Sequence, residues 1–204
     1  MKNLLKVICS VSILLLVFSA CVSTGSGGGS GGGAAPASVT LIPATSIIGW
    51  NPMNGGLTVK DGVVNFTGIL EGSTYKLQHR YAFTRRADLS AFPNGFLQMD
   101  MMVSDIQMMD NTEATIHLAS GEFNYAKWNF GKTGSFDEGL SPQIPDESGV
   151  WTTVFLPLWA NSWKDNCTEN GYNLAKIEGF QIFMSGIPVE GTISIRNIKV
   201  VSEP

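Results

Sequence analysis

Side chains that could carry out acid–base or nucleophilic chemistry are few in this chain of 204 residues. His79 and His117 are its only histidines, and neither belongs to a zinc-ligand pair or to the motif of a serine hydrolase. A glycoside hydrolase needs two carboxylates about 5–10 Å apart across a cleft. The candidate acids lie in a stretch rich in Gly, Pro and Ser, where carboxylates are usually solvated; they are Asp137, Glu138, Asp146 and Glu147. We therefore expect a protein that is not an enzyme and that uses no metal or other cofactor.

Hydrogen bonding to a ligand is the chemistry that the sequence does favour. Six polar side chains alternate with apolar ones in segments with the period of a β-strand. If these strands are neighbours, the six residues form one polar row on the outer face of a sheet, although a plain solvated face would have the same pattern. The row consists of Gln78, Arg80, Gln98, Asp100, His117 and Gln181.

Aromatic side chains could complete such a surface, because a sugar ring stacks its apolar face on Trp or Tyr. Tyr125 and Trp128 flank the polar row in this interpretation, and Trp50 opens a loop rich in Asn and Gly. Trp159 and Trp163 have the four-residue spacing that places two side chains on one side of a helical turn. The alternative for each tryptophan is packing at the edge of the core.

The elements that must position these residues are short strands separated by Gly, Pro, Asn and Asp, with Asp61-Gly62 as a tight hairpin turn. Short helical turns are expected at residues 87–90, 158–163 and 174–177. This spacing without a βαβ rhythm predicts an all-β fold, a two-sheet antiparallel β-sandwich of the jelly-roll type. Leu97, Met99, Met101 and Val103 would face the core. The predicted strands are 38–42, 47–50, 57–60, 63–66, 75–84, 96–104, 114–119, 124–130, 151–157, 179–184 and 192–201.

The N-terminus combines Lys2 and Lys6 with an apolar run and then Ser19, Ala20 and Cys21. This arrangement resembles the signal of bacterial lipoproteins, with Phe18 where that family usually has Leu. The resemblance implies that residues 1–20 are a signal peptide and that Cys21 is lipidated. An ordinary signal peptide or an uncleaved anchor is the alternative, although the apolar run is shorter than the roughly 20 residues that span a membrane.

A flexible linker follows, because residues 24–33 read TGSGGGSGGG. We expect three parts: the signal at 1–20, the lipidated Cys21 with its linker at 21–36, and one β-sandwich domain at 37–204. The expected location is the cell envelope of a bacterium, held to a membrane by the lipid. Val22 after the cysteine is compatible with the outer membrane or the cell surface.

Charge and cysteine content narrow the partners further. The chain has 13 basic and 17 acidic side chains, and two of the basic ones would leave with the signal. A dispersed acidic charge excludes nucleic acid, which requires a basic stripe. Cys9 leaves with the signal and Cys21 carries lipid, so Cys167 has no partner within the domain and stability must come from packing.

Four short passages resemble carbohydrate-binding modules of the galactose-binding-like jelly-roll type. They are Asp88-Leu89-Ser90 followed by the strand at 95–100, then the stretches at 151–158, 177–182 and 193–200. The resemblance implies binding of a glycan or polysaccharide without catalysis. Many such modules hold calcium near their termini, but Arg196 stands where the closing strand usually has Asp, which makes a calcium site doubtful. A structural or adhesive lipoprotein that binds a protein partner is the alternative.

Overall fold

The computed structural model describes residues 37–110, 112–121, 124–129, 144–159 and 172–204. The chain divides into two units, Met1–Gly33 and Ala34–Pro204, and all described residues belong to the second. Cys21, the linker, Trp163 and Cys167 lie outside the described residues, as do Asp137 and Glu138. Within the described residues no helix is long and apolar enough to cross a bilayer.

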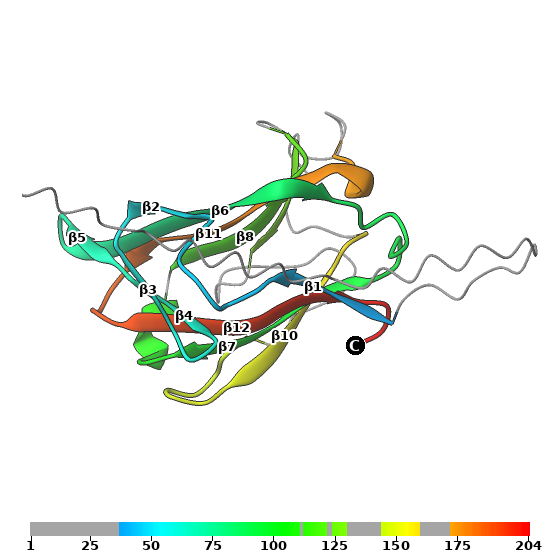
Figure 1. The fold of residues 1–204 in the computed structure, drawn as a ribbon. Coiled ribbons are helices and arrows are strands. Elements are labelled where there is room, and N and C mark those ends of the chain that lie inside the picture. Colours follow the sequence, from blue (N-terminus) through cyan, green and yellow to red (C-terminus); the bar gives the residue numbers. More distant parts are fainter. Residues whose placement is uncertain (1–36, 111, 122–123, 130–143, 160–171) are drawn as a thin grey trace, which may run out of the picture. The chain divides into compact units, whose positions relative to one another are not determined.

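Two antiparallel sheets form the domain, and Figure 1 shows their strands in two layers. We call them sheet A and sheet B. Sheet A has the order β10 (Thr152–Pro157), β7 (Phe96–Val103), β12 (Thr192–Val201), β4 (Val63–Thr67) and β3 (Gly56–Lys60), and β1 (Ser38–Ile42) also pairs with β12. Sheet B has the order β2 (Trp50–Asn54), β6 (Thr74–Ala87), β11 (Ile177–Ile187), β8 (Glu113–Ala119) and β9 (Tyr125–Asn129), and β5 (Ile69–Glu71) also pairs with β6. The predicted all-β sandwich is confirmed.

The core lies between the two sheets and follows the alternation of the strands. On β7 the side chains of Leu97, Met99, Met101 and Val103 are fully buried, as predicted, while those between them are partly exposed. β11 contributes Phe180, Ile182 and Met184 from the opposite sheet. Burial of these apolar side chains provides the main stabilisation, which is consistent with a domain that relies on packing.

The predicted hairpin at Asp61-Gly62 joins β3 to β4, and both of its residues have positive φ, 52° and 78°. Both residue types adopt this conformation readily, so the turn matches the twist of the paired strands. The predicted strand at 47–50 is wrong, because β2 begins only at Trp50. Gly49 precedes it with a φ of 93°, and a Cβ there would lie 2.7 Å from the Tyr81 ring. The left-handed glycine therefore ends a turn and β2 starts after it.

The predicted helical turns at 174–177 and 87–90 had different outcomes. A 3-10 helix at Leu174–Lys176 confirms one of them. The turn expected at 87–90 is wrong, since β6 continues to Ala87 and the Asp88 carboxylate then accepts hydrogen bonds from the backbone and hydroxyl of Ser90. These bonds replace a helical turn with an Asx turn and lower the pKa of Asp88. A 3-10 helix at Ile106–Met109 and the strand β5 were not predicted.

A histidine lies in this core without a hydrogen-bond partner. His79 on β6 is fully buried, packs against Phe66 at 5.1 Å between ring centroids, and neither ring nitrogen is hydrogen-bonded to a described residue. Burial lowers the pKa of His79 from its ordinary 6.5 to about 4. The folded protein therefore holds this imidazole neutral, at the cost of desolvating its polar atoms.

This burial predicts a loss of stability in mild acid. Because the folded pKa is depressed, the unfolded chain takes up the proton first, and stability falls between about pH 6.5 and the folded value. The free energy of unfolding should drop by about 1 kcal/mol per such histidine from about pH 7 to about pH 5.5. In His79→Leu we expect that share of the loss to disappear, as measured by urea unfolding at both pH values. Parallel loss in the wild type and the variant would contradict the assignment.

Candidate functional site

The structure separates the six predicted polar residues between two sheets. Gln98 and Asp100 lie on β7 of sheet A, whereas Gln78, Arg80, His117 and Gln181 belong to sheet B. The side chains of both groups point away from the shared core, so they occupy opposite outer faces of the sandwich. The prediction of one continuous row is therefore wrong, because alternation gives the face of a strand and does not give the sheet to which the strand belongs.

Asp100 connects three strands of sheet A. Its carboxylate accepts hydrogen bonds from Thr153 Oγ1 on β10 at 3.0 Å, and from Arg196 Nε and Asn197 Nδ2 on β12 at 3.2 and 2.7 Å. The Arg196 guanidinium also lies over the Trp151 ring, 4.1 Å from its centroid. Trp151 thus faces outward, on the same side of sheet A as Arg196. Since the Asp100 oxygens are engaged in this way, we interpret the residue as structural.

Three of the four polar residues of sheet B stand side by side. Arg80 on β6 is directly opposite Gln181 on β11, Gln181 is opposite His117 on β8, and His117 is opposite Lys127 on β9. Gln78 lies one row further along, opposite Phe183, and its side-chain oxygen accepts a hydrogen bond from Asn54. This part of the predicted polar row is confirmed as an arrangement across neighbouring strands.

Small residues occupy the next row of the same face. Ala82, Gly179 and Ala119 are neighbours in register, and Tyr125 on β9 follows Ala119. Above this row the surface is hollowed into two depressions of about 160 and 320 Å³, which share Arg80, Ala119 and Gly179 as lining residues. We call the two together the sheet B groove. Its floor lies low because three adjacent positions carry a methyl group or a hydrogen.

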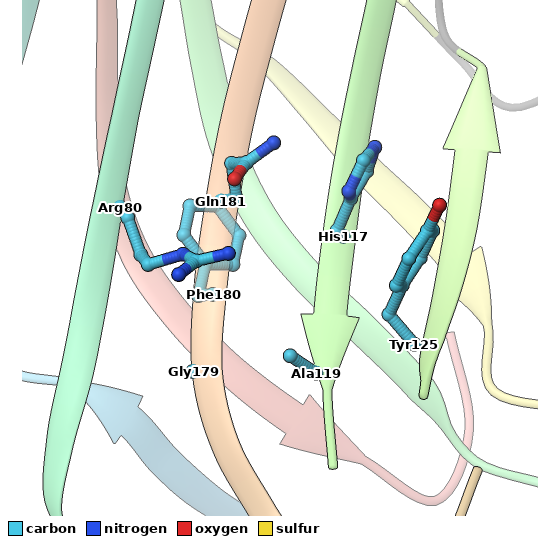
Figure 2. A pocket seen from close by; sticks show the side chains of 7 residues that line it. All are labelled: Arg80, His117, Ala119, Tyr125, Gly179, Phe180 and Gln181. Carbon is cyan, nitrogen blue, oxygen red and sulfur yellow. The ribbon is translucent and has the colours of Figure 1, made fainter. Parts of the chain in front are cut away.

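Figure 2 shows the smaller depression and the side chains around it. Arg80, Gln181, His117 and Tyr125 come from four adjacent strands, and the Arg80 side chain extends toward β11. The rings of His117 and Tyr125 are stacked, with 4.8 Å between centroids and an angle of 3° between planes. This pair forms one wall of the groove.

The His117 imidazole is neutral in this position. Its Nε2 lies 3.1 Å from the Thr115 hydroxyl. Burial, followed by the positive charges of Lys127 and Arg80, lowers the pKa of His117 to about 3. At neutral pH the ring can therefore accept as well as donate a hydrogen bond, depending on its tautomer.

Most of the predicted aromatic residues that the structure describes do not line the sheet B groove. Trp128 is fully buried and its Nε1 donates to the Pro157 carbonyl at 3.0 Å, so its proposed place beside the polar row is wrong. Trp50 is also buried, edge-on to Phe66, Tyr81 and Phe180. Trp159 is 45% exposed, but it follows β10 of sheet A and its ring packs against Phe96 at 4.9 Å. Trp163 lies outside the described residues. Of the predicted aromatics that the structure describes, only Tyr125 lines the groove.

Sequence reasoning missed the floor of the groove. A glycine within an otherwise bulky strand often marks a close approach of a ligand or of another backbone, which was the available signal for Gly179. Ala82 and Ala119 gave no such signal, because their importance depends on their register with Gly179. Among the described residues no group of three or more metal-ligating side chains is found.

No known protein family and no curated protein matches the sequence. Solved structures do share the fold. An agarase superposes with a TM-score of 0.52 at 11% identity over 83% of this chain, and an exo-beta-agarase with 0.53 at 10% over 81%. The chain spans about a quarter of each agarase, 25% and 24%.

A family 11 carbohydrate-binding module from Clostridium thermocellum, in complex with a beta-1,3-1,4-mixed-linked tetrasaccharide, superposes with a TM-score of 0.51 at 16% identity. The match covers 81% of this chain and 96% of the module. At these identities the likeness concerns the fold alone. The jelly-roll sandwich of this chain is thus an architecture that it shares with carbohydrate-binding modules.

The contacts of Asp100 predict a structural role that can be measured. Asp100→Ala leaves three donors without their acceptor, so we expect the free energy of unfolding to fall by about 1–3 kcal/mol in denaturant titrations. Gln98→Ala, two residues away on the same face, should change it by less than about 0.5 kcal/mol. Equal effects of the two substitutions would count against the structural role.

Proposed function

We propose that this protein binds carbohydrate in the sheet B groove without cleaving it, and that a lipid on Cys21 holds it in the bacterial cell envelope. One observation carries the first part. A low floor of small residues lies beside the stacked His117–Tyr125 pair and within reach of Arg80 and Gln181.

The groove suits a polyhydroxyl ligand. Each sugar hydroxyl both donates and accepts hydrogen bonds, and the Gln181 amide offers both functions on one side chain. A neutral imidazole at His117 does the same through its tautomers. The small floor residues let a ring approach the sheet, and depressions of about 160 and 320 Å³ suit a few sugar units better than a large enclosed cofactor.

The residues around the groove favour binding over hydrolysis. Glu178 is the one carboxylate among the described lining residues, and it forms an ion pair with Arg86. A glycosidase mechanism requires a second carboxylate on the other side of the scissile bond. A carbohydrate-binding module shares this fold, so the architecture is compatible with a binding role.

A protein partner is the second candidate, and one observation favours it. The strands β2 and β5 both pair with β6, and they expose Met53, Ile69 and Leu70 by 50, 45 and 62%. Ile47 and Ile48, in the turn before β2, are also exposed. Large apolar side chains along one sheet edge are a feature of protein-binding surfaces.

Filling the floor tests the carbohydrate site. Ala119→Phe would place a ring in the groove, and Tyr125→Ala would remove part of its wall. We expect the first to abolish binding to a glycan array, because the groove is filled, and the second to weaken binding about tenfold, because the stacking surface is lost. The inter-sheet core should stay intact in both variants. The matched control is Gln98→Ala on sheet A, which should bind like the wild type. Full retention by Ala119→Phe would exclude the sheet B groove.

The anchor is tested separately by Cys21→Ser. Acylation needs the cysteine sulfur, so the variant should move from the membrane fraction to the soluble fraction when cells are lysed and separated by ultracentrifugation. Cys167→Ser serves as the control and should remain with the membranes. Membrane retention of Cys21→Ser would contradict the lipid attachment.

A further inference from the structure

One side chain of the sheet B groove can only donate hydrogen bonds. Arg80 carries five N–H donors and no acceptor, and it lines both depressions. His117 and Gln181 can serve in either role. Each hydroxyl of a neutral sugar both donates and accepts hydrogen bonds, so a site for such a sugar needs acceptors as well as donors. Carboxylates are the usual acceptors for the hydroxyl hydrogens. The described lining residues offer one carboxylate, Glu178, which is already paired with Arg86.

Arg80 differs from the other cations of this face. Lys127 lies 3.6 Å from the Glu113 carboxylate, and Arg86 pairs with Glu178. Arg80 is exposed, and no carboxylate of the described residues lies within ion-pair distance of it. One positive charge is thus left unbalanced at the groove, in a chain with a net charge of −4.

The position of this charge matches the groove. Arg80 lines both depressions, and Figure 2 shows its guanidinium reaching toward β11. The positive potential is also felt by a neighbour, since Arg80 and Lys127 both contribute to the lowered pKa of His117. A guanidinium presents two parallel N–H groups, which fit the two oxygens of a carboxylate or sulfate.

We infer that the sheet B groove selects an acidic polysaccharide, one that bears carboxylate or sulfate groups, with Arg80 as the residue that determines this specificity. The inference rests on the proposed carbohydrate binding and adds the class of ligand. A neutral polysaccharide would leave the Arg80 charge unpaired, whereas an acidic one neutralises it with charge-assisted hydrogen bonds.

The test compares polymers that differ only in charge. The full chain, purified in detergent, is titrated with polygalacturonate and with its methyl-esterified form, and in a second arm with sulfated carrageenan and with the same carrageenan after desulfation. We expect at least one acidic polymer to bind about tenfold more tightly than its neutral counterpart, and the preference to shrink in high salt. The two arms show whether carboxylate or sulfate is the preferred group.

Two arginine substitutions locate the effect. Arg80→Gln should remove the preference for the acidic polymer, and Arg80→Lys should keep part of it, because the charge remains without the paired N–H groups. Arg85→Gln is the matched control, since Arg85 is exposed on the same strand but lines neither depression. It should retain the preference.

The outcomes separate this inference from the proposed function. Equal binding of neutral and acidic polymers, with a loss in Ala119→Phe, would overturn the selection for acidic ligands and leave carbohydrate binding intact. Equal losses in Arg80→Gln and Arg85→Gln would show a non-specific charge effect and also overturn it. If the protein binds none of the polysaccharides, both the carbohydrate binding and the selection for acidic ligands are refuted.

Discussion

The candidate site depends on the register of β11, which pairs with β6 on one side and β8 on the other. Phe180, Ile182 and Met184 are held in the core, so Gly179 and Gln181 must face outward. A slip of one residue would expose Phe180 and bury the Gln181 amide. The loss of apolar burial on one side and the desolvation of an amide on the other oppose this slip. The core therefore fixes the groove although none of its apolar side chains need touch a ligand.

The two outer faces obey the same alternation but carry different side chains. On sheet A the outward side chains are large or mutually bonded: Phe96 packs against Phe155 and Trp159, and Asp100 accepts from three neighbours. On sheet B the central row is made of small residues, and the polar side chains beside it line the sheet B groove. Sheet B thus has a groove on its outer face because the side chains at three positions in register, Ala82, Gly179 and Ala119, are small.

Alternation and turn residues predicted most strands, the hairpin at Asp61-Gly62 and the core face of β7, because these depend on neighbours in the sequence. The assignment of β7 to sheet A could not be predicted in this way, since strand pairing is a long-range property, and the polar row was consequently drawn across both sheets. The error at Trp128 was different: side chains alternate along a strand, so Trp128 lies on the face opposite to Tyr125 and Lys127 and could not flank the same row as Tyr125. Its burial with a hydrogen bond to Pro157 follows from the neighbouring sheet. Alternation with Leu77 and Tyr81 places His79 on the core face, but no sequence signal shows that its imidazole is buried without a hydrogen-bond partner.

The fold that this chain shares with other proteins depends on its core, whereas any ligand site depends on the side chains of its outer faces. Jelly rolls with 10–16% identity to this chain keep the layered core, whose apolar alternation tolerates wide substitution. Outward side chains do not affect that core, so they can change without loss of the fold, and a likeness at this level carries no ligand with it. The sheet B groove of this chain combines a low floor with an unpaired Arg80, on a face where Arg86 and Lys127 pair with carboxylates. Under the proposed function, a fold of this kind supplies the surface, and the uncompensated charge of Arg80 would select the polymer.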